Sequence, residues 1–252
     1  MDFNHLSRQS FYAWFNTSSG IRLLEEEQLE LGNILPSLFG YHIIQLGSLN
    51  KEINLLSSSY ILDQVIVDIE ISKNSQMPNV ISKIDILPFG SETIDVVLLP
   101  HTLEYAPSPH FLLQEVQRVL IPNGTLIILG LNPWSFLGIR RFFPYKGEQI
   151  PWYGHFYSLT HIQRWLALLG FKVVKSRYFL FHSTAKCSRL IKNLYSLVNT
   201  KCYLSPFFFE GYLLIANKEV VRLNPVDLKW EKQGGVEISG VVEPVAQVHF
   251  HD

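Results

Sequence analysis

Cysteine, charged residues and long apolar runs are all scarce in this chain of 252 residues. The two cysteines, Cys187 and Cys202, are too far apart for a CxxC redox or zinc motif and too few for a secreted disulfide scaffold. Charged residues make up 17% of the chain, against about 25% in an average globular protein. The net charge of −1 gives no basic surface for nucleic acid. We therefore expect a protein of the reducing cytoplasm that does not bind nucleic acid.

The sequence also lacks the patterns that are typical of a membrane span and of a signal peptide. No apolar run reaches the roughly 18 residues that a membrane span needs. The first residues, MDFNHLSRQSFYAWF, lack a basic stretch followed by an apolar one, so we expect no signal peptide. The chain does have a hydrophobic share of 47% and an aromatic share of 13%, which allow a full core and leave apolar surface for a partner.

Short apolar runs alternate with amphipathic segments from residue 41 onward. This spacing predicts strands at 41–46, 64–69, 80–84, 94–99, 125–129, 171–181 and 210–217, and helices at 21–39, 109–120 and 161–169. Continuous apolar runs of this length are typical of strands that are buried on both faces of a parallel sheet. The alternation predicts a doubly wound, Rossmann-like α/β domain at 41–217. A helical extension at 1–40 and a loose tail at 218–252 flank it.

Two segments have features of their own. In the helix expected at 21–39, Leu24, Leu31 and Leu35 fall on one side and the acids at 25–27 on the side expected to face solvent. Residues 132–157 are dense in aromatic residues, proline and glycine. This aromatic segment is either a lid for an apolar acceptor, a satellite core or a surface for a protein partner. Stacking on nucleic acid bases is a further alternative that the charge does not support.

Six short motifs together point to a known family. The chain carries DILPF at 85–89, ID at 94–95, LEY at 103–105, RVLIPNG at 118–124, FYSLT at 156–160 and LGF at 169–171. In this order they resemble the class I S-adenosylmethionine-dependent methyltransferases of the type 11 branch, over roughly residues 40 to 180. The pattern NPxSFxGxR at 132–140 is similar to the YafS-like bacterial subgroup. The resemblance implies a seven-stranded, mostly parallel sheet with helices on both faces, S-adenosylmethionine as cofactor, and methyl transfer to a small or apolar acceptor.

The expected ligand site lies outside the carboxyl ends of the parallel strands. Asp68, or else Glu70, follows the second strand about 20 residues past Gly47 and would bind the ribose hydroxyls, with Ile69 beside it. The alternative for Asp68 is an ordinary acid at a strand end. The resemblance further implies that Asp85 and the amide of Ile86 bind the adenine edge. The alternative for Asp85 is a residue that only forms a turn.

The end of the fourth expected strand brings a titratable group to the same edge. Pro100 would line the cofactor, and His101 could act as a general base near neutral pH. The alternative for His101 is a histidine that only hydrogen-bonds a loop.

The loop after the first strand departs from the family pattern. The family carries Asp-x-Gly-x-Gly-x-Gly there, and this chain keeps Gly47 but has Gln45, Leu49 and Lys51 at the other three positions. Glycine lets a backbone approach a ligand closely, so this loop is either a variant cofactor site or the mark of a methyltransferase-like binding module without activity. A nicotinamide-dependent oxidoreductase fits less well, because its phosphate-binding turn needs the missing glycines.

Overall fold

The structure of the protein is a computed structural model that describes residues 11–50, 53–69, 79–135, 138, 155–179 and 209–219. The described residues all fall within one compact unit, residues 1–220. The division into a helical extension at 1–40 and an α/β domain at 41–217 stays a prediction. The second unit, residues 221–252, lies outside the described residues, and the loose tail stays a prediction.

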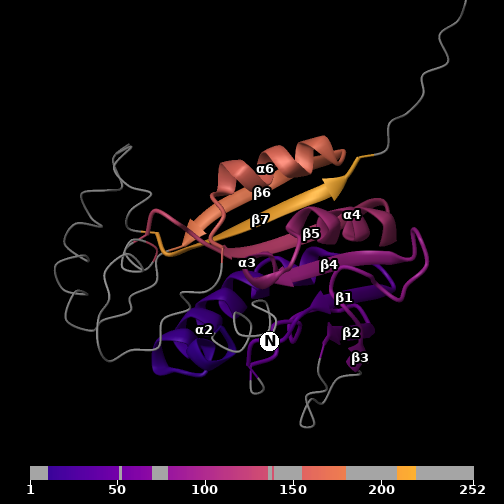
Figure 1. The fold of residues 1–252 in the computed structure, drawn as a ribbon. Helices are drawn as coiled ribbons and strands as arrows, with labels where there is room; N and C mark the ends of the chain where they lie inside the picture. Colours follow the sequence, from indigo (N-terminus) through magenta and orange to yellow (C-terminus); the bar gives the residue numbers. More distant parts are fainter. Residues whose placement is uncertain are drawn as a thin grey trace, which may run out of the picture. The chain divides into compact units, whose positions relative to one another are not determined.

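A single seven-stranded sheet organises the described chain (Figure 1). The strand order is β3-β2-β1-β4-β5-β7-β6. Strands β1 to β5 pair in parallel, whereas β7 runs antiparallel between β5 and β6. The bounds are β1 His42–Leu46, β2 Asp63–Asp68, β3 Asn79–Ile81, β4 Ile94–Pro100, β5 Leu120–Leu131, β6 Phe171–Phe179 and β7 Gly211–Lys218. The predicted seven-stranded, mostly parallel sheet is confirmed.

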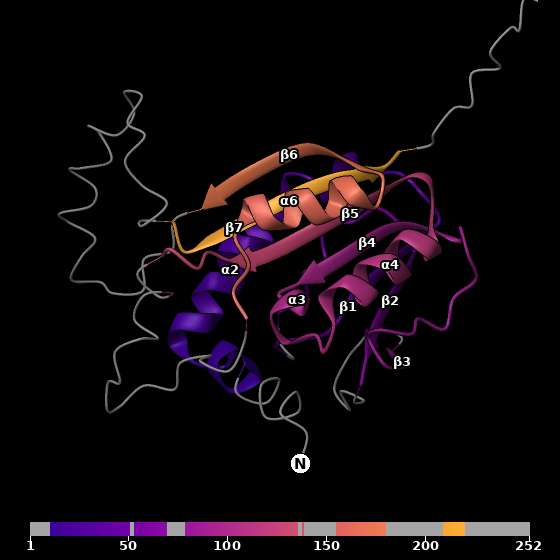
Figure 2. The ribbon, with the colours of Figure 1, turned by 45° about the horizontal axis from the view of Figure 1, so that its top comes forward.

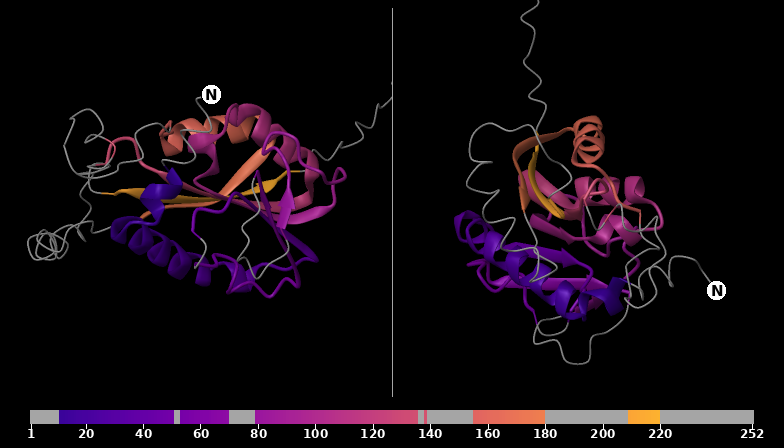
Figure 3. Two further views of the ribbon diagram at one scale, coloured as in Figure 1. Left: turned by 60° about the horizontal axis from the view of Figure 1, so that its bottom comes forward. Right: turned by 90° about the vertical axis from the view of Figure 1, so that its left-hand side faces the viewer.

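Helices cover both faces of this sheet. The bounds are α2 Ser18–Gly32, the 3-10 turn η1 Leu35–Ser37, α3 Thr102–Tyr105, α4 Pro109–Val119 and α6 Leu159–Leu168. Figure 2 shows α4 and α6 on one face, and Figure 3 shows α2 on the opposite face. The central strand β4 is buried accordingly, with Val97, Leu98 and Leu99 fully inaccessible to solvent. Within the described ranges, no helix has the length and apolarity to cross a membrane.

The first predicted helix is shorter and starts earlier than expected. It begins at Ser18 because the side chain of Thr17 accepts a hydrogen bond from the amide of Gly20, an N-terminal cap. It ends at Gly32 rather than at 39, and the chain tightens into η1 around Pro36, which has no amide to continue the ladder.

The connection between β1 and β2 contains no α-helix in its described parts, 47–50 and 53–62. Helix α2 packs against this connection instead. The side-chain amide of Gln28 donates to the carbonyl of Asn54 and to the hydroxyl of Ser57, both at 2.9 Å. The loop after β1 is therefore supported by an element that precedes the sheet in sequence.

Candidate functional site

Gly47 ends β1 in a conformation that only glycine adopts easily. Its φ is +88°, and a Cβ built there would lie 1.9 Å from the hydroxyl oxygen of Tyr105. The amide of Gly47 donates to the carbonyl of Val67 at 2.8 Å. The glycine is therefore needed to admit the protein's own Tyr105.

The residues that replace the family's acid and second glycine close the same loop. The Gln45 side chain donates to the carbonyl of Gly47 at 2.8 Å, a bond that an aspartate could not make because it has no N–H. The hydroxyl of Thr102 donates to the carbonyl of Leu46 at 2.5 Å. Leu49 is buried in the core. Lys51 lies outside the described residues.

The N-terminal segment lies against this loop as well. The side chain of Asn50 donates to the carbonyl of Phe15 and to the side-chain oxygen of Asn16. The ring of Phe11 lies 6.2 Å from that of Tyr105, centroid to centroid. The space beside the loop, where the family pattern leads us to expect the methionine half of the cofactor, is lined by buried side chains.

The end of β2 contacts the loop after β1. Asp68 is buried. Its carboxylate accepts hydrogen bonds from the amide of Ser48 at 3.2 Å and from the amide of Ile69 at 2.7 Å. Ile69 itself is exposed. Glu70, the alternative acid, lies outside the described residues. The ribose-binding role of Asp68 stays a prediction. The position of Asp68 next to the loop after β1 agrees with that role.

The β3–β4 loop brings the second predicted acid to the same edge. Its first part is tied to β2, since the amide of Ser82 donates to the carbonyl of Asp68 at 3.0 Å. Asp85 is half-buried and makes no hydrogen bond with the described residues, and Ile86 is 64% exposed. The amide of Ile86 donates to the carbonyl of Lys83 over a long 3.3 Å. The adenine role of Asp85 and Ile86 stays a prediction.

His101 follows the buried Pro100 at the end of β4 and is fully inaccessible to solvent. Its Nε2 lies 2.8 Å from a carboxylate oxygen of Glu27, and its Nδ1 lies 3.4 Å from one of Glu104. Burial opposes the charged imidazolium, but the two carboxylates outweigh it and raise the pKa of His101 to about 10. A general base needs a free nitrogen near neutral pH. The catalytic role of His101 stays a prediction that these contacts disfavour.

Three buried carboxylates near this edge were not predicted as site residues from the sequence. Glu27 was expected on the solvent side of its helix, and that expectation is wrong, because the side chain is fully buried against His101. Glu104 also accepts the amide of Leu131 at 2.8 Å. Glu210 precedes β7, and burial raises its pKa to about 8. Within the described part of the chain, each of the three glutamates has one buried carboxylate oxygen without a hydrogen bond.

The first positions of the NPxSFxGxR pattern form a tight turn after β5. The side chain of Asn132 accepts the amide of Trp134 and donates to the carbonyl of Phe209. The hydroxyl of Ser135 donates to the carbonyl of Asn132 and accepts the amide of Gly138 at 2.9 Å. Asn132 and Ser135 thus have a structural role. Most of the aromatic segment at 132–157 lies outside the described residues, so its role as a lid, core or partner surface stays a prediction.

Comparisons with known proteins agree with this geometry. A family model described as a methyltransferase domain, of type 11, matches residues 57–128. The chain is 34% identical over 150 residues to "Uncharacterized protein YafS" of Escherichia coli (strain K12), a match that covers 60% of each protein. It is 31% identical over 113 residues to "Uncharacterized protein MJ1123" of Methanocaldococcus jannaschii, covering 44% of this chain and 54% of that protein. The chain thus spans less than two thirds of either relative.

Solved structures share the fold at low sequence identity. One is a SAM-dependent methyltransferase of Thermotoga maritima, with a TM-score of 0.61 and 16% identity over 86% of this chain and 100% of that one. Another is a SAM-dependent methyltransferase of Archaeoglobus fulgidus, with a TM-score of 0.56 and 18% identity over 77% of this chain and 94% of that one. Residues 57–128 are thus similar to the type 11 methyltransferases, part of the chain is similar to YafS, and the fold is that of class I S-adenosylmethionine-dependent methyltransferases of known structure.

Proposed function

We propose that the chain binds S-adenosylmethionine at the carboxyl edge of its sheet and directs its methyl group to a small or apolar acceptor. The observation that carries this proposal is the bond that ties the start of the β3–β4 loop to the end of β2. The amide of Ser82, three residues before Asp85, donates to the carbonyl of Asp68 at 3.0 Å. Ligands of open parallel sheets bind at this edge.

The adenosine half of the cofactor fits the residues present. Asp85 lacks a hydrogen bond to the described residues, so its carboxylate can accept a hydrogen bond from the amino group of an adenine. The carboxylate of Asp68 already holds the start of the glycine loop and would accept ribose hydroxyls at the same place. Ile69 and Pro100 would line this half.

The methionine half has less room in the described loop. Gln45 and Tyr105 take up the polar groups and the space around Gly47, as shown above. We therefore infer that the adenosine half supplies most of the affinity, and that the loop at 47–50 shifts when the cofactor binds.

Methyl transfer needs little chemistry from the chain itself. S-adenosylmethionine supplies the methyl group on its sulfonium when bound, and the protein holds the acceptor in line with it. His101 is not assigned as a base here, because both ring nitrogens face carboxylates. His101 would instead fix the end of β4 beside the acceptor.

Calorimetric titration with S-adenosylmethionine, and separately with S-adenosylhomocysteine, tests the proposal. We expect micromolar binding by the parent and a loss of about tenfold or more, roughly 1.4 kcal/mol, in Asp68→Asn and in Asp85→Asn. Asp63→Asn is the matched control, because Asp63 lies at the other end of β2, where it pairs with His42 on the surface.

The alternative function is a binding module without methyl transfer. The closed loop favours it, since the Gln45 side chain already occupies the carbonyl of Gly47. No binding by the parent at millimolar ligand would reject the methyltransferase proposal, and concentration-dependent self-association would then support the module.

A further inference from the structure

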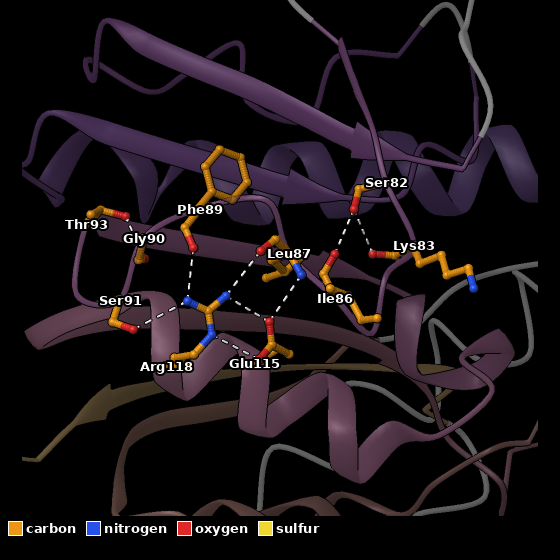
Figure 4. A network of polar contacts seen from close by, with 10 residues as sticks. All are labelled: Ser82, Lys83, Ile86, Leu87, Phe89, Gly90, Ser91, Thr93, Glu115 and Arg118. Carbon is orange, nitrogen blue, oxygen red and sulfur yellow. Dashed lines mark hydrogen bonds and ion pairs between the residues drawn. The ribbon is translucent and has the colours of Figure 1, made fainter.

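The β3–β4 loop is fixed at its first end by Ser82 (Figure 4). The hydroxyl of Ser82 donates to the carbonyl of Ile86 at 2.7 Å and to that of Lys83 at 3.2 Å. These bonds close a short turn that contains Asp85. The first end of the loop is thus held by a side chain of the same loop.

The second end is held from helix α4. The guanidinium of Arg118 donates to the carbonyl of Leu87 at 3.1 Å and to that of Phe89 at 2.9 Å. The carboxylate of Glu115 accepts the amide of Leu87 at 3.1 Å. Both main-chain groups of Leu87 are therefore bound by one helix, 28 to 31 positions further along the chain.

Glu115 and Arg118 also hold each other in a two-pronged ion pair. Nε of Arg118 lies 3.0 Å from one carboxylate oxygen of Glu115, and Nη2 lies 2.9 Å from the other. The hydrogen bonds from Arg118 lower the pKa of Glu115, so the pair stays charged at neutral pH. Such a bidentate ion pair has a more defined geometry than a single contact.

Asp85 and Ile86 lie between these two anchors. The half-buried Asp85 makes no hydrogen bond with the described residues, and the side chain of Ile86 is exposed, so neither side chain is fixed by a hydrogen bond or by full burial. Apart from the turn at Ser82, their position depends on where Leu87 is held. A carboxylate that recognises an amino group must be placed to within a fraction of an ångström.

We propose that Glu115 and Arg118 are positioning residues of the adenine subsite, which hold Asp85 where its carboxylate accepts a hydrogen bond from the 6-amino group of the cofactor and Ile86 where its amide donates to the adenine ring. This inference rests on the proposed function, because it takes the ligand to be S-adenosylmethionine. The pair is partly exposed, with 35% of the Arg118 side chain and 23% of the Glu115 side chain accessible. Exposed ion pairs contribute little to folding stability, so their removal should loosen the loop without unfolding the protein.

The test compares two ligands that differ only at the edge of the base. S-adenosylhomocysteine carries the 6-amino donor and an N1 acceptor, whereas S-inosylhomocysteine carries a carbonyl oxygen at position 6 and a hydrogen on N1. Calorimetry on the full chain should show that the parent prefers the adenine ligand by about tenfold or more, as expected when a carboxylate loses its donor. We expect Arg118→Met to reduce this preference to about threefold or less, and Glu115→Gln to reduce it less.

The ratio of the dissociation constants of the two ligands separates a positioning role from a structural role. A general loss of structure would weaken the binding of both ligands alike. Arg177→Met is the matched control, since Arg177 forms a surface pair with Glu30 on another element and its loss should leave the ratio unchanged. Thermal unfolding of each variant checks the fold.

The outcomes separate this inference from the proposed function. An unchanged preference in Arg118→Met would overturn the positioning role and leave the proposed function intact. A parent that binds both ligands equally would overturn the adenine subsite and the positioning role together. A parent that binds neither would overturn the proposed function, and this inference with it.

Discussion

The loop after β1 and the start of the β3–β4 loop lie at the same edge of the sheet but are held in different ways. In the first, the side chains of Gln45 and Thr102 bind the loop's own carbonyls, and Tyr105 fills the space at Gly47. In the second, the contacts come from outside the recognising residues, and Asp85 and Ile86 are left presented. The loop after β1 is filled by the protein's own side chains, whereas the side chain of Ile86 in the β3–β4 loop stays exposed.

This difference shows that a degenerate motif need not imply a lost site. The loop after β1 departs from the family in sequence, and its replacements form specific bonds rather than open space. The β3–β4 loop matches the family, and its anchors lie in a helix far along the chain. We therefore expect the two halves of the ligand to be recognised with different strength, and the variants below test that expectation.

The largest effect should come from Glu27, which joins α2 to His101 beside the closed loop. Glu27→Ala should lower the free energy of unfolding by about 3–5 kcal/mol, because it leaves a buried imidazolium short of a partner. The folded pKa of His101, about 10, lies above its unfolded value of about 6.5. The stabilisation is therefore complete below about pH 6.5 and is lost as the pH rises through 10.

Urea unfolding at pH 6 and at pH 9.5 measures this effect. The cost of Glu27→Ala should be largest at pH 6 and should shrink at pH 9.5. Glu30→Ala is the control on the same helix, since its pair with Arg177 is exposed and should matter by less than about 1 kcal/mol. Equal costs for the two variants would contradict the importance of the buried pair.

The next effect compares one glycine from each loop. Gly47→Ala should cost about 2–4 kcal/mol, because the new Cβ meets Tyr105 at a positive φ. Gly90→Ala in the β3–β4 loop should cost less than about 1 kcal/mol, since its Cβ would lie 3.1 Å from a methyl group of Thr93 that can shift. Thermal unfolding measures both.

A second substitution locates the cause at Gly47. Adding Tyr105→Phe to Gly47→Ala removes the hydroxyl and leaves the nearest ring carbon at 3.3 Å. The double variant should recover part of the lost stability and keep the strain of the positive φ. Parental stability of the Gly47→Ala variant would show that the loop is not closed on Tyr105.

The smallest effect concerns charge in the closed loop. Gln45→Asp removes the donor to the carbonyl of Gly47 and restores the family's carboxylate. We expect the preference for S-adenosylmethionine over S-adenosylhomocysteine to rise by about fivefold, roughly 1 kcal/mol, because only the first carries a sulfonium charge. Gln45→Asn is the matched neutral control, and an equal change in both variants would reject the electrostatic explanation.

The fold was largely predictable from the sequence, because buried parallel strands are marked by continuous apolar runs. The strands at β1, β4 and β5 all lie where those runs are. The first helix was placed less well, since the cap at Thr17 and the break around Pro36 are local signals that compete with the leucine spacing.

The site was less predictable, because its contacts join residues that are distant in sequence. Glu27 was placed in solvent since its partner His101 lies 74 positions away. Arg118 belongs to the motif at 118–124, which was used only for the family resemblance, yet its side chain binds the carbonyl of Phe89, 29 positions back. A single sequence shows which residue types are present, and not which of them are paired by the fold.

The anchors of the β3–β4 loop have a consequence for how such a chain can diverge. Arg118 and Glu115 bind main-chain atoms of Leu87 and Phe89, and every residue type other than proline offers the same atoms. Exchanges at the exposed Pro88 therefore leave the anchors intact. Exchanges of Glu115 or Arg118 in α4 remove the anchors. Substitutions in the loop are therefore tolerated more easily than substitutions at these two positions of the helix.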